Sequence, residues 1–166
     1  LNILLVSIPS KLPSLVPIVR CFVGAYLPQN GQSLFDLANT DAESLLPPAL
    51  IPSKDQLTLD IKKDQVINIF CQDGSALMKL KILVKFKVEP AIRFVQPATV
   101  SEANFGKVPK YYIQTLQDHA VGPDLQKRMI AAAKIDDNNV YPLNSSHCPF
   151  LSMPDAVTDL LFKISR

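Results

Sequence analysis

Two stretches near the carboxyl end decide the fold: GKVPKYYIQTLQDHAVGPDLQKRMIAAAK (residues 106–134) and VYPLNSSHCPFLSMPDAVTDLL (residues 140–161). The first contains a run rich in β-branched and aromatic residues at 107–116, which predicts a strand. After the loop QDHAVG, Pro123 suits the first position of a helix, and the apolar residues that follow it recur every three or four positions. The first stretch therefore predicts a strand followed by a helix.

The second stretch repeats this order. Residues 138–143 (NNVYPL) predict a short strand, and a closing helix is expected to begin near Pro154. Strands that alternate with helices over so short a distance imply parallel strands joined by right-handed crossovers. The end of the chain is therefore predicted to be α/β.

Working outward, residues 17–25 (PIVRCFVGA) form an apolar run that suits a buried strand of a parallel sheet. A long, less regular middle follows, with helix candidates at 63–70 and 74–86. The part LMKLKILVKFKV alternates apolar residues with lysine and fits a strand equally well. We divide the chain into an apolar segment with the first core strand (1–36), an insertion (37–105) and a core of two strands and two helices (106–166).

The composition describes a globular chain. Of 166 residues, 48% are hydrophobic and 19% are charged, which excludes intrinsic disorder. The formal net charge is +2, so bulk electrostatics predict no nucleic-acid partner. The three cysteines fit neither a disulfide framework nor paired zinc ligands, and they favour a reducing, cytoplasmic compartment.

The apolar start of the chain predicts neither a membrane span nor a signal peptide. Pro9, Pro13 and Pro17 would each interrupt a helix. Both positive charges lie inside the apolar run, whereas a signal peptide carries its positive charge before that run. We therefore expect no membrane partner.

Two polar residues are candidates for chemistry. Asp118 follows the strand at 107–116, and His147 follows the strand at 138–143. Active groups of open α/β sheets lie just past the carboxyl ends of strands, so the two loops are expected at one edge. An aspartate that accepts the Nδ1 proton of a histidine leaves Nε2 to act as a base. In the alternative interpretation, Asp118 caps the next helix and His147 is an ordinary loop residue.

Their neighbours have simpler interpretations. His119 is expected to point away from Asp118 and to lie on the surface. Cys148 beside His147 could suggest a thiol nucleophile, but consecutive side chains rarely form a working pair, so we interpret it as a packing residue.

The order V-P-x-x-Y-I-x-T-x-x-D, then a helix, then x-S-x-H-x-P resembles the carboxyl-terminal part of the α/β-hydrolase superfamily, in the branch of methylesterases and hydroxynitrile lyases. The segment AYLPQNGQSLFDL (residues 25–37) is similar to that branch's loop between the sixth sheet strand and the cap. The resemblance implies an α/β fold of parallel strands with flanking helices, plus a mostly helical cap at 37–105.

By this resemblance, Asp118 matches the acid and His147 the base of a Ser–His–Asp triad. The complete enzyme would hydrolyse a small apolar ester through an acyl-enzyme, without metal or organic cofactor. Cys148 occupies the position at which the lyases carry a lysine, which favours the esterase interpretation.

The sequence departs from the family at the nucleophile. No two of the five glycines are four residues apart, so G-x-S-x-G does not occur in it. Ser7 follows an apolar run but is succeeded by Pro9, and Ser145 and Ser146 are too close to His147 in sequence. We therefore expect the nucleophile to lie outside these residues. The alternatives are an inactive remnant, or a binding half-domain that forms a homo-oligomer or accepts a complementing chain at its exposed sheet edge.

Overall fold

The computed structural model describes residues 5–8 and 19–165, and prolines 9, 13 and 17 lie outside them. In chain order the strands, α-helices and 3-10 helices (η) are β1 (Leu5–Ile8), β2 (Val19–Val23), α1 (Leu34–Ala38), η1 (Pro47–Ala49), β3 (Leu50–Pro52), β4 (Thr58–Ile61), α2 (Val66–Phe70), α3 (Ala76–Lys85), β5 (Glu89–Pro90), α4 (Ile92–Val95), η2 (Phe105–Lys107), β6 (Lys110–Thr115), α5 (Pro123–Ala132), η3 (Asp137–Asn139), β7 (Val140–Leu143), α6 (Pro149–Ser152) and α7 (Pro154–Ile164).

The main sheet has the strand order β1-β2-β6-β7. Strands β2, β6 and β7 run parallel, as predicted, and Tyr112 of β6 lies opposite Phe22 on one side and Val140 on the other. The edge strand β1 pairs antiparallel with β2, which the sequence did not predict. The core is therefore a parallel sheet with one reversed edge strand.

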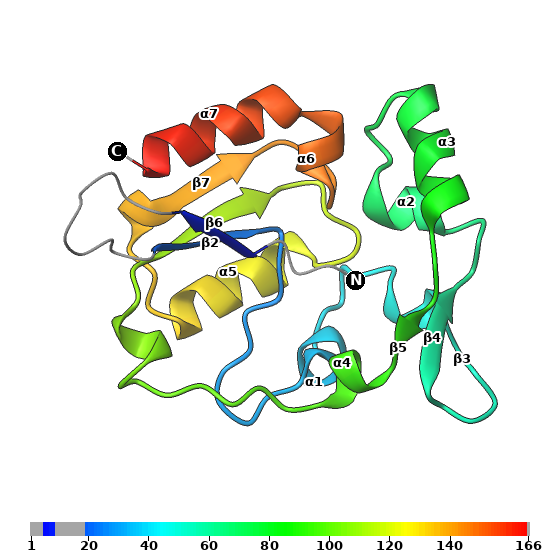
Figure 1. The fold of residues 1–166 in the computed structure, drawn as a ribbon, viewed down its shortest axis with the longest axis horizontal. Helices are drawn as coiled ribbons and strands as arrows, with labels where there is room; N and C mark the ends of the chain where they lie inside the picture. The colour runs from blue at the N-terminus through cyan, green and yellow to red at the C-terminus, as the bar shows by residue number, and fades with distance from the viewer. Residues whose placement is uncertain (1–4, 9–18, 166) are drawn as a thin grey trace.

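Helices cover both faces of this sheet (Figure 1). Because side chains alternate along a strand, Phe22 and Tyr112 pack on the side of α5. Cys21 and Ile113 pack on the opposite side, against Ile164 of α7. The three layers explain why the core strands are apolar on both faces.

The predicted core elements are confirmed, with shifted ends. The strand expected at 107–116 is β6, preceded by η2, and the strand expected at 138–143 is β7, preceded by η3. Pro123 is the first residue of α5 and Pro154 the first residue of α7. In both places proline begins the helix because the first turn needs no backbone N–H donor.

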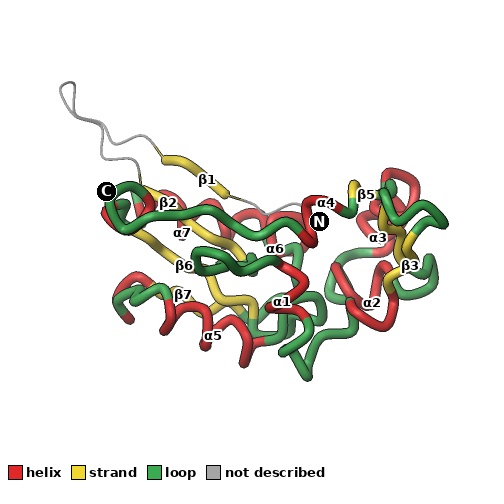
Figure 2. Tube along the Cα trace, turned by 90° about the horizontal axis from the view of Figure 1, so that it is seen from below, coloured by secondary structure: helices red, strands yellow, loops and turns green. Residues whose placement is uncertain are grey.

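The strands β3, β4 and β5 and the helices α2 and α3 of the middle of the chain gather at one end of the main sheet (Figure 2). The ambiguous stretch of this middle part is the helix α3, which begins after Ser75, whose hydroxyl accepts a hydrogen bond from the Met78 amide. A small antiparallel sheet, β3-β4-β5, was not predicted, because strands of two to four residues give no readable period. The grouping of 37–105 as one insertion stays a prediction, and we call this segment the cap.

No helix in the described part of the chain is both long and apolar enough to cross a membrane.

Candidate active site

The loops that follow β6 and β7 lie side by side. Backbone pairing continues past the strand ends, because the Leu116 amide donates to the Leu143 carbonyl at 2.9 Å and the Gln117 amide to the Ser145 carbonyl at 3.0 Å. These bonds bring the residues just after each strand together. The two predicted site residues stand on these loops.

Asp118 and His147 are in direct contact. The His147 Nδ1 atom lies 2.9 Å from Asp118 Oδ2, with the aspartate side chain fully buried and the histidine side chain 14% exposed. A carboxylate oxygen only accepts, so Nδ1 carries the proton and Nε2 has a free lone pair. The arrangement can take up a proton at Nε2, with the carboxylate beside the resulting imidazolium.

The second oxygen of Asp118 serves the backbone. Its Oδ1 accepts hydrogen bonds from the amides of Ala120 at 2.8 Å and Val121 at 2.9 Å. The Thr115 hydroxyl donates to Oδ2 at 2.7 Å. The two interpretations of Asp118 are thus compatible, because one oxygen shapes the turn before α5 while the other holds the histidine.

Gln126 links this carboxylate to the sheet. Its buried amide accepts from the Thr115 amide and donates to the Thr115 and Val121 carbonyls, at 2.7 to 3.0 Å. Sequence reasoning missed Gln126 and Thr115. The available signal was position: Gln126 adjoins Leu125 on the buried side of a helix, where a polar residue needs partners.

Gly24 gives the carboxylate room. It directly follows β2 and has a φ of +52°, and a Cβ there would lie 2.6 Å from Thr115 Oγ1 and 3.0 Å from Asp118 Oδ2. A glycine is required both by the left-handed backbone and by the close approach. The sequence contains no signal for this role.

Buried groups around the dyad stay uncharged. Burial raises the pKa of Tyr112, and the nearby Asp118 adds to the rise. Burial also raises the pKa of Cys148 to about 12, with Cys71, Asp118 and Asp73 contributing. A thiol held in this form is a poor nucleophile, in keeping with the interpretation of Cys148 as a packing residue.

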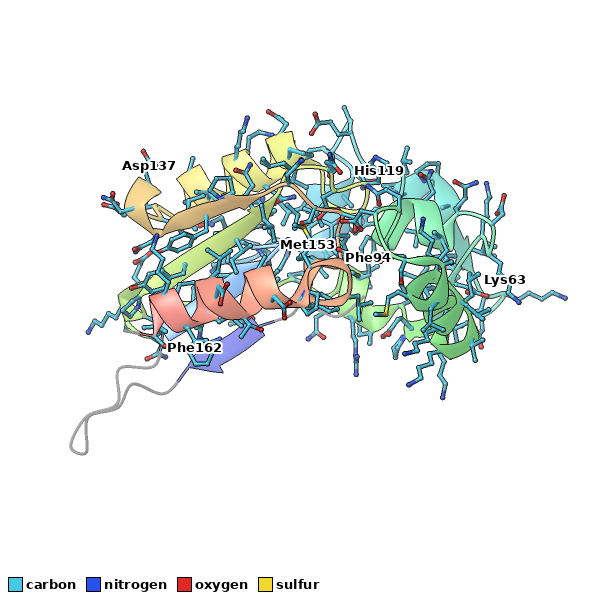
Figure 3. The ribbon with its side chains drawn as sticks, turned by 90° about the horizontal axis from the view of Figure 1, so that it is seen from above. Lys63, Phe94, His119, Asp137, Met153 and Phe162 are labelled. Atoms are coloured by element: carbon cyan, nitrogen blue, oxygen red, sulfur yellow. The ribbon has the colours of Figure 1, made fainter. Side chains whose placement is uncertain are left out.

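His119 points away from Asp118, as expected, but it is not on an open surface. The side chain is half-buried beside the cap (Figure 3), with Nδ1 2.8 Å from the Asn68 carbonyl oxygen. The side chain thus lies at the surface but is partly covered by the cap, and the sequence does not reveal that contact.

Of the serines singled out in the sequence, Ser145 and Ser146 lie on the loop between β7 and α6, next to His147, and Ser7 lies in a strand. Ser7 lies within β1 and pairs with Arg20. The Ser145 hydroxyl is buried and has no hydrogen-bond partner among the described residues. The Ser146 hydroxyl donates to a carboxylate oxygen of Asp73.

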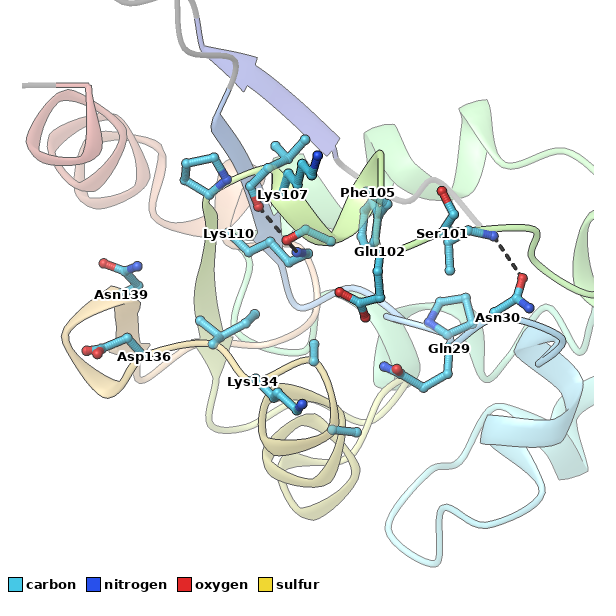
Figure 4. A pocket seen from close by; sticks show the side chains of 18 residues that line it. Gln29, Asn30, Ser101, Glu102, Phe105, Lys107, Lys110, Lys134, Asp136 and Asn139 are labelled. Carbon is cyan, nitrogen blue, oxygen red and sulfur yellow. Dashed lines mark hydrogen bonds between the residues drawn. The ribbon is translucent and has the colours of Figure 1, made fainter.

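A cavity of about 720 Å³ lies at the other end of the sheet (Figure 4). It includes Lys110, the first residue of β6, whose ammonium donates to the carbonyls of Gly106 and Val108 at 3.2 Å. Partial burial lowers the pKa of Lys110. Neither Asp118 nor His147 lines this cavity, so it is separate from the dyad.

The described residues contain no group of three histidine, cysteine, aspartate or glutamate side chains that could hold a metal ion.

Curated relatives are plant methylesterases. Over 171 residues the chain is 31% identical to the putative chloroplastic methylesterase 11 of Arabidopsis thaliana. This match covers 95% of this chain and 41% of that protein. The putative methylesterase 15 of the same plant is 27% identical over 169 residues, or 95% of this chain and 36% of that protein. The chain thus spans about two fifths of the length of these relatives, and no family model matches it.

Solved structures share the fold. Tomato methylketone synthase I superposes with a TM-score of 0.71 at 13% identity, over 87% of this chain and 60% of that chain. A mutant of polyneuridine aldehyde esterase superposes with a TM-score of 0.67 at 16% identity, over 88% of this chain and 61% of that chain. A pyrethroid hydrolase from Sphingobium faniae gives 0.68 at 16% identity, over 87% and 59%. With its sheet order and its flanking helices, the chain has an α/β-hydrolase fold, and it is similar to a part of the methylesterase-like proteins of that fold.

Proposed function

We propose that this chain carries the acid and base of a carboxylesterase-type active site. The observation that supports it is the 2.9 Å contact between His147 Nδ1 and the buried Asp118 carboxylate, which itself accepts two backbone amides and a hydroxyl. His147 acts as general base and then as general acid through Nε2. Asp118 orients the imidazole and stabilises its protonated form.

The proposed reaction is hydrolysis of a small apolar carboxylic ester. A serine hydroxyl gives its proton to Nε2 as its oxygen bonds to the ester carbonyl, and the alcohol leaves with that proton. Water then attacks the acyl-enzyme in the same way and releases the acid. The esterase and hydrolase names of several relatives support this class.

The nucleophile in this proposal is a serine outside these 166 residues. The sequence has no G-x-S-x-G, and Ser7 lies in an antiparallel edge strand rather than on a tight turn. Loss of a nucleophile typically removes on the order of 10⁶ in rate, so the chain alone is expected to be almost inactive.

The test uses the purified chain with a fluorophosphonate probe and with p-nitrophenyl acetate. We expect no covalent labelling, and slow ester hydrolysis that disappears in His147→Ala and falls in Asp118→Asn. Labelling of a serine in this chain that His147→Ala abolishes would contradict an external nucleophile. Hydrolysis indifferent to both substitutions would favour the alternative, an inactive remnant or binding half-domain.

Other properties of the complete protein follow as proposals. A complementing chain, or a second copy of this one, would dock at the β1 edge of the sheet. If that partner supplied the serine, docking would complete the site. The cap would shape the ester pocket and set its preference. The three free cysteines suit a reducing compartment, proposed here as the cytoplasm, although the curated relatives are described as chloroplastic.

A further inference from the structure

The residues on both sides of His147 are held by one turn of the cap. We call residues 144–148 the base loop and residues 70–73 the cap turn. The Cys148 amide donates to the Phe70 carbonyl at 3.0 Å, and the Ser146 amide donates to Asp73 Oδ2 at 3.0 Å. His147 therefore lies between two anchored neighbours.

Asp73 is the charged member of this contact. Its carboxylate accepts from the Ser146 amide, from the Ser146 hydroxyl and from the Ser152 hydroxyl, the last at 3.0 Å. Charge-assisted hydrogen bonds of this kind are roughly twice as strong as neutral ones. One cap carboxylate thus ties the base loop to Ser152, the last residue of α6.

The cap turn also contacts the imidazole. The Phe70 ring lies 5.5 Å from the His147 ring, centroid to centroid, at an angle of 57°. On its other side, Asp118 holds Nδ1. The ring is thus packed by the cap and oriented by the core, and a shift of the cap turn would move the base loop against Asp118.

We propose that Asp73 is a positioning residue that acts on His147 through Ser146, so that docking of the cap sets the geometry of the base. We call Asp73 with Ser146 and Ser152 the Asp73 clamp. An effect of the clamp on catalysis rests on the proposed function above. Its effect on the position of the His147 ring is independent of that function. When the cap turn is docked, the proton on His147 Nδ1 stays hydrogen-bonded to Asp118, and when the clamp is broken the base loop samples other positions.

The experiment measures exchange of the His147 Nδ1 proton with water, by NMR of protein labelled with nitrogen-15 in its histidines. The chain has two histidines, and His119 serves as an internal reference because its Nδ1 contacts Asn68 of the cap. In Asp73→Asn we expect exchange at His147 to accelerate about tenfold or more, as local opening of the base loop becomes easier. Exchange at His119 should stay unchanged.

Two further variants sharpen the test. Asp64→Asn makes the same change in the cap at an exposed carboxylate, which among the described residues accepts from the neighbouring Gln65 side chain and has no contact with the base loop. It should leave both histidines unaffected. Ser146→Ala removes the hydroxyl donor but keeps the amide, so a smaller acceleration is expected at His147 alone. This variant carries the test if Asp73→Asn does not fold.

Unchanged exchange at His147 in both clamp variants would overturn the proposal. Equal acceleration at His119 and His147 would also overturn it, because the cap would then detach as a whole. The two proposals can also fail separately. If Asp73→Asn accelerates exchange of the His147 proton but the chain shows no ester hydrolysis that depends on His147, the proposed function is contradicted and the positioning role of Asp73 still holds. Where that hydrolysis is measurable, Asp73→Asn should lower kcat with little change in KM.

Discussion

Gly24 combines a left-handed backbone with a close approach to Thr115 and Asp118, which leaves no room for a Cβ atom. We expect Gly24→Ala to destabilise the protein by about 2–4 kcal/mol, since a positive φ and overpacking each cost roughly 1–3 kcal/mol. Gly31→Ala is the matched control: φ is +82°, but nothing lies within 4 Å of the added Cβ, so only the backbone cost applies. Urea unfolding of both variants measures the difference. Equal losses would show that the Gly24 contact with Thr115 and Asp118 is unimportant.

The cysteines provide a second prediction at the residue scale. Burial raises the pKa of Cys21 and Cys148 to about 12, and raises that of Cys71 as well. At pH 8 the thiolate fraction at a pKa of 12 is roughly a thousandfold below that of a free cysteine. Alkylation by iodoacetamide should therefore be slow in the native protein and rapid in urea. Rapid native alkylation of Cys148 would instead favour a thiol nucleophile beside His147.

The same shifts predict how stability responds to alkaline pH. A thiol whose pKa is raised by folding keeps its proton in the native state and loses it in the unfolded state. The stabilisation is complete below the unfolded pKa of about 8.5 and is lost as the pH rises toward the folded value. The urea midpoint should therefore fall above about pH 9, and serine at the three positions should weaken this dependence.

At the scale of elements, α3 and α5 have ten residues each and opposite environments. Helix α5 buries Leu125, Gln126, Met129 and Ile130, whereas α3 buries none of its residues. Local unfolding is easiest where few apolar contacts hold an element, so amide hydrogens of α3 should exchange faster than those of α5. Hydrogen exchange read by mass spectrometry on peptides from each helix checks this. Equal protection would indicate that a partner covers Leu77, Leu80 and Val84, which are exposed in this structure.

At the scale of the whole molecule, the attachment of the cap to the core depends on pH through Asp73. Partial burial raises the pKa of this carboxyl, but the hydrogen bonds from Ser146 and Ser152 outweigh that effect and leave the pKa below its ordinary value. A depressed carboxyl pKa contributes stability above the unfolded value of about 3.9, which is lost as the pH falls through the folded value. Asp73 is partly exposed, so we expect a contribution of less than about 1 kcal/mol.

Acid unfolding followed by circular dichroism tests this attachment. Between pH 5 and pH 3 the parent protein should lose more stability than Asp73→Asn, in which the titrating group is absent. Asp64→Asn should behave like the parent. Parallel curves for all three proteins would mean that the Asp73 carboxylate adds nothing to cap docking.

The predictable part of the site is the part that strand order controls. Asp118 and His147 could be placed on one sheet edge because each directly follows a strand of a parallel sheet. Gly24 could not be found in this way, because its role depends on its distance to Thr115 and Asp118, which lie far from it in the sequence. Gln126 lies within 11 residues of its partners, and the signal available for it was its position on the buried side of α5 rather than strand order. The half-buried position of His119 has the same cause as the role of Gly24, since the covering carbonyl belongs to Asn68 in the cap.

The sequence by itself determined the strand and helix order of the last third of the chain, the starts of α5 and α7 at prolines, the family resemblance, and the absence of a G-x-S-x-G motif. Each is local, because it depends on residue types within a few positions of one another. Only the tertiary structure decided that β1 reverses at the sheet edge, that Asp118 uses both oxygens, and that Asp73 reaches the base loop. These features join residues up to 73 positions apart, whose contact depends on how the layers pack rather than on any local pattern.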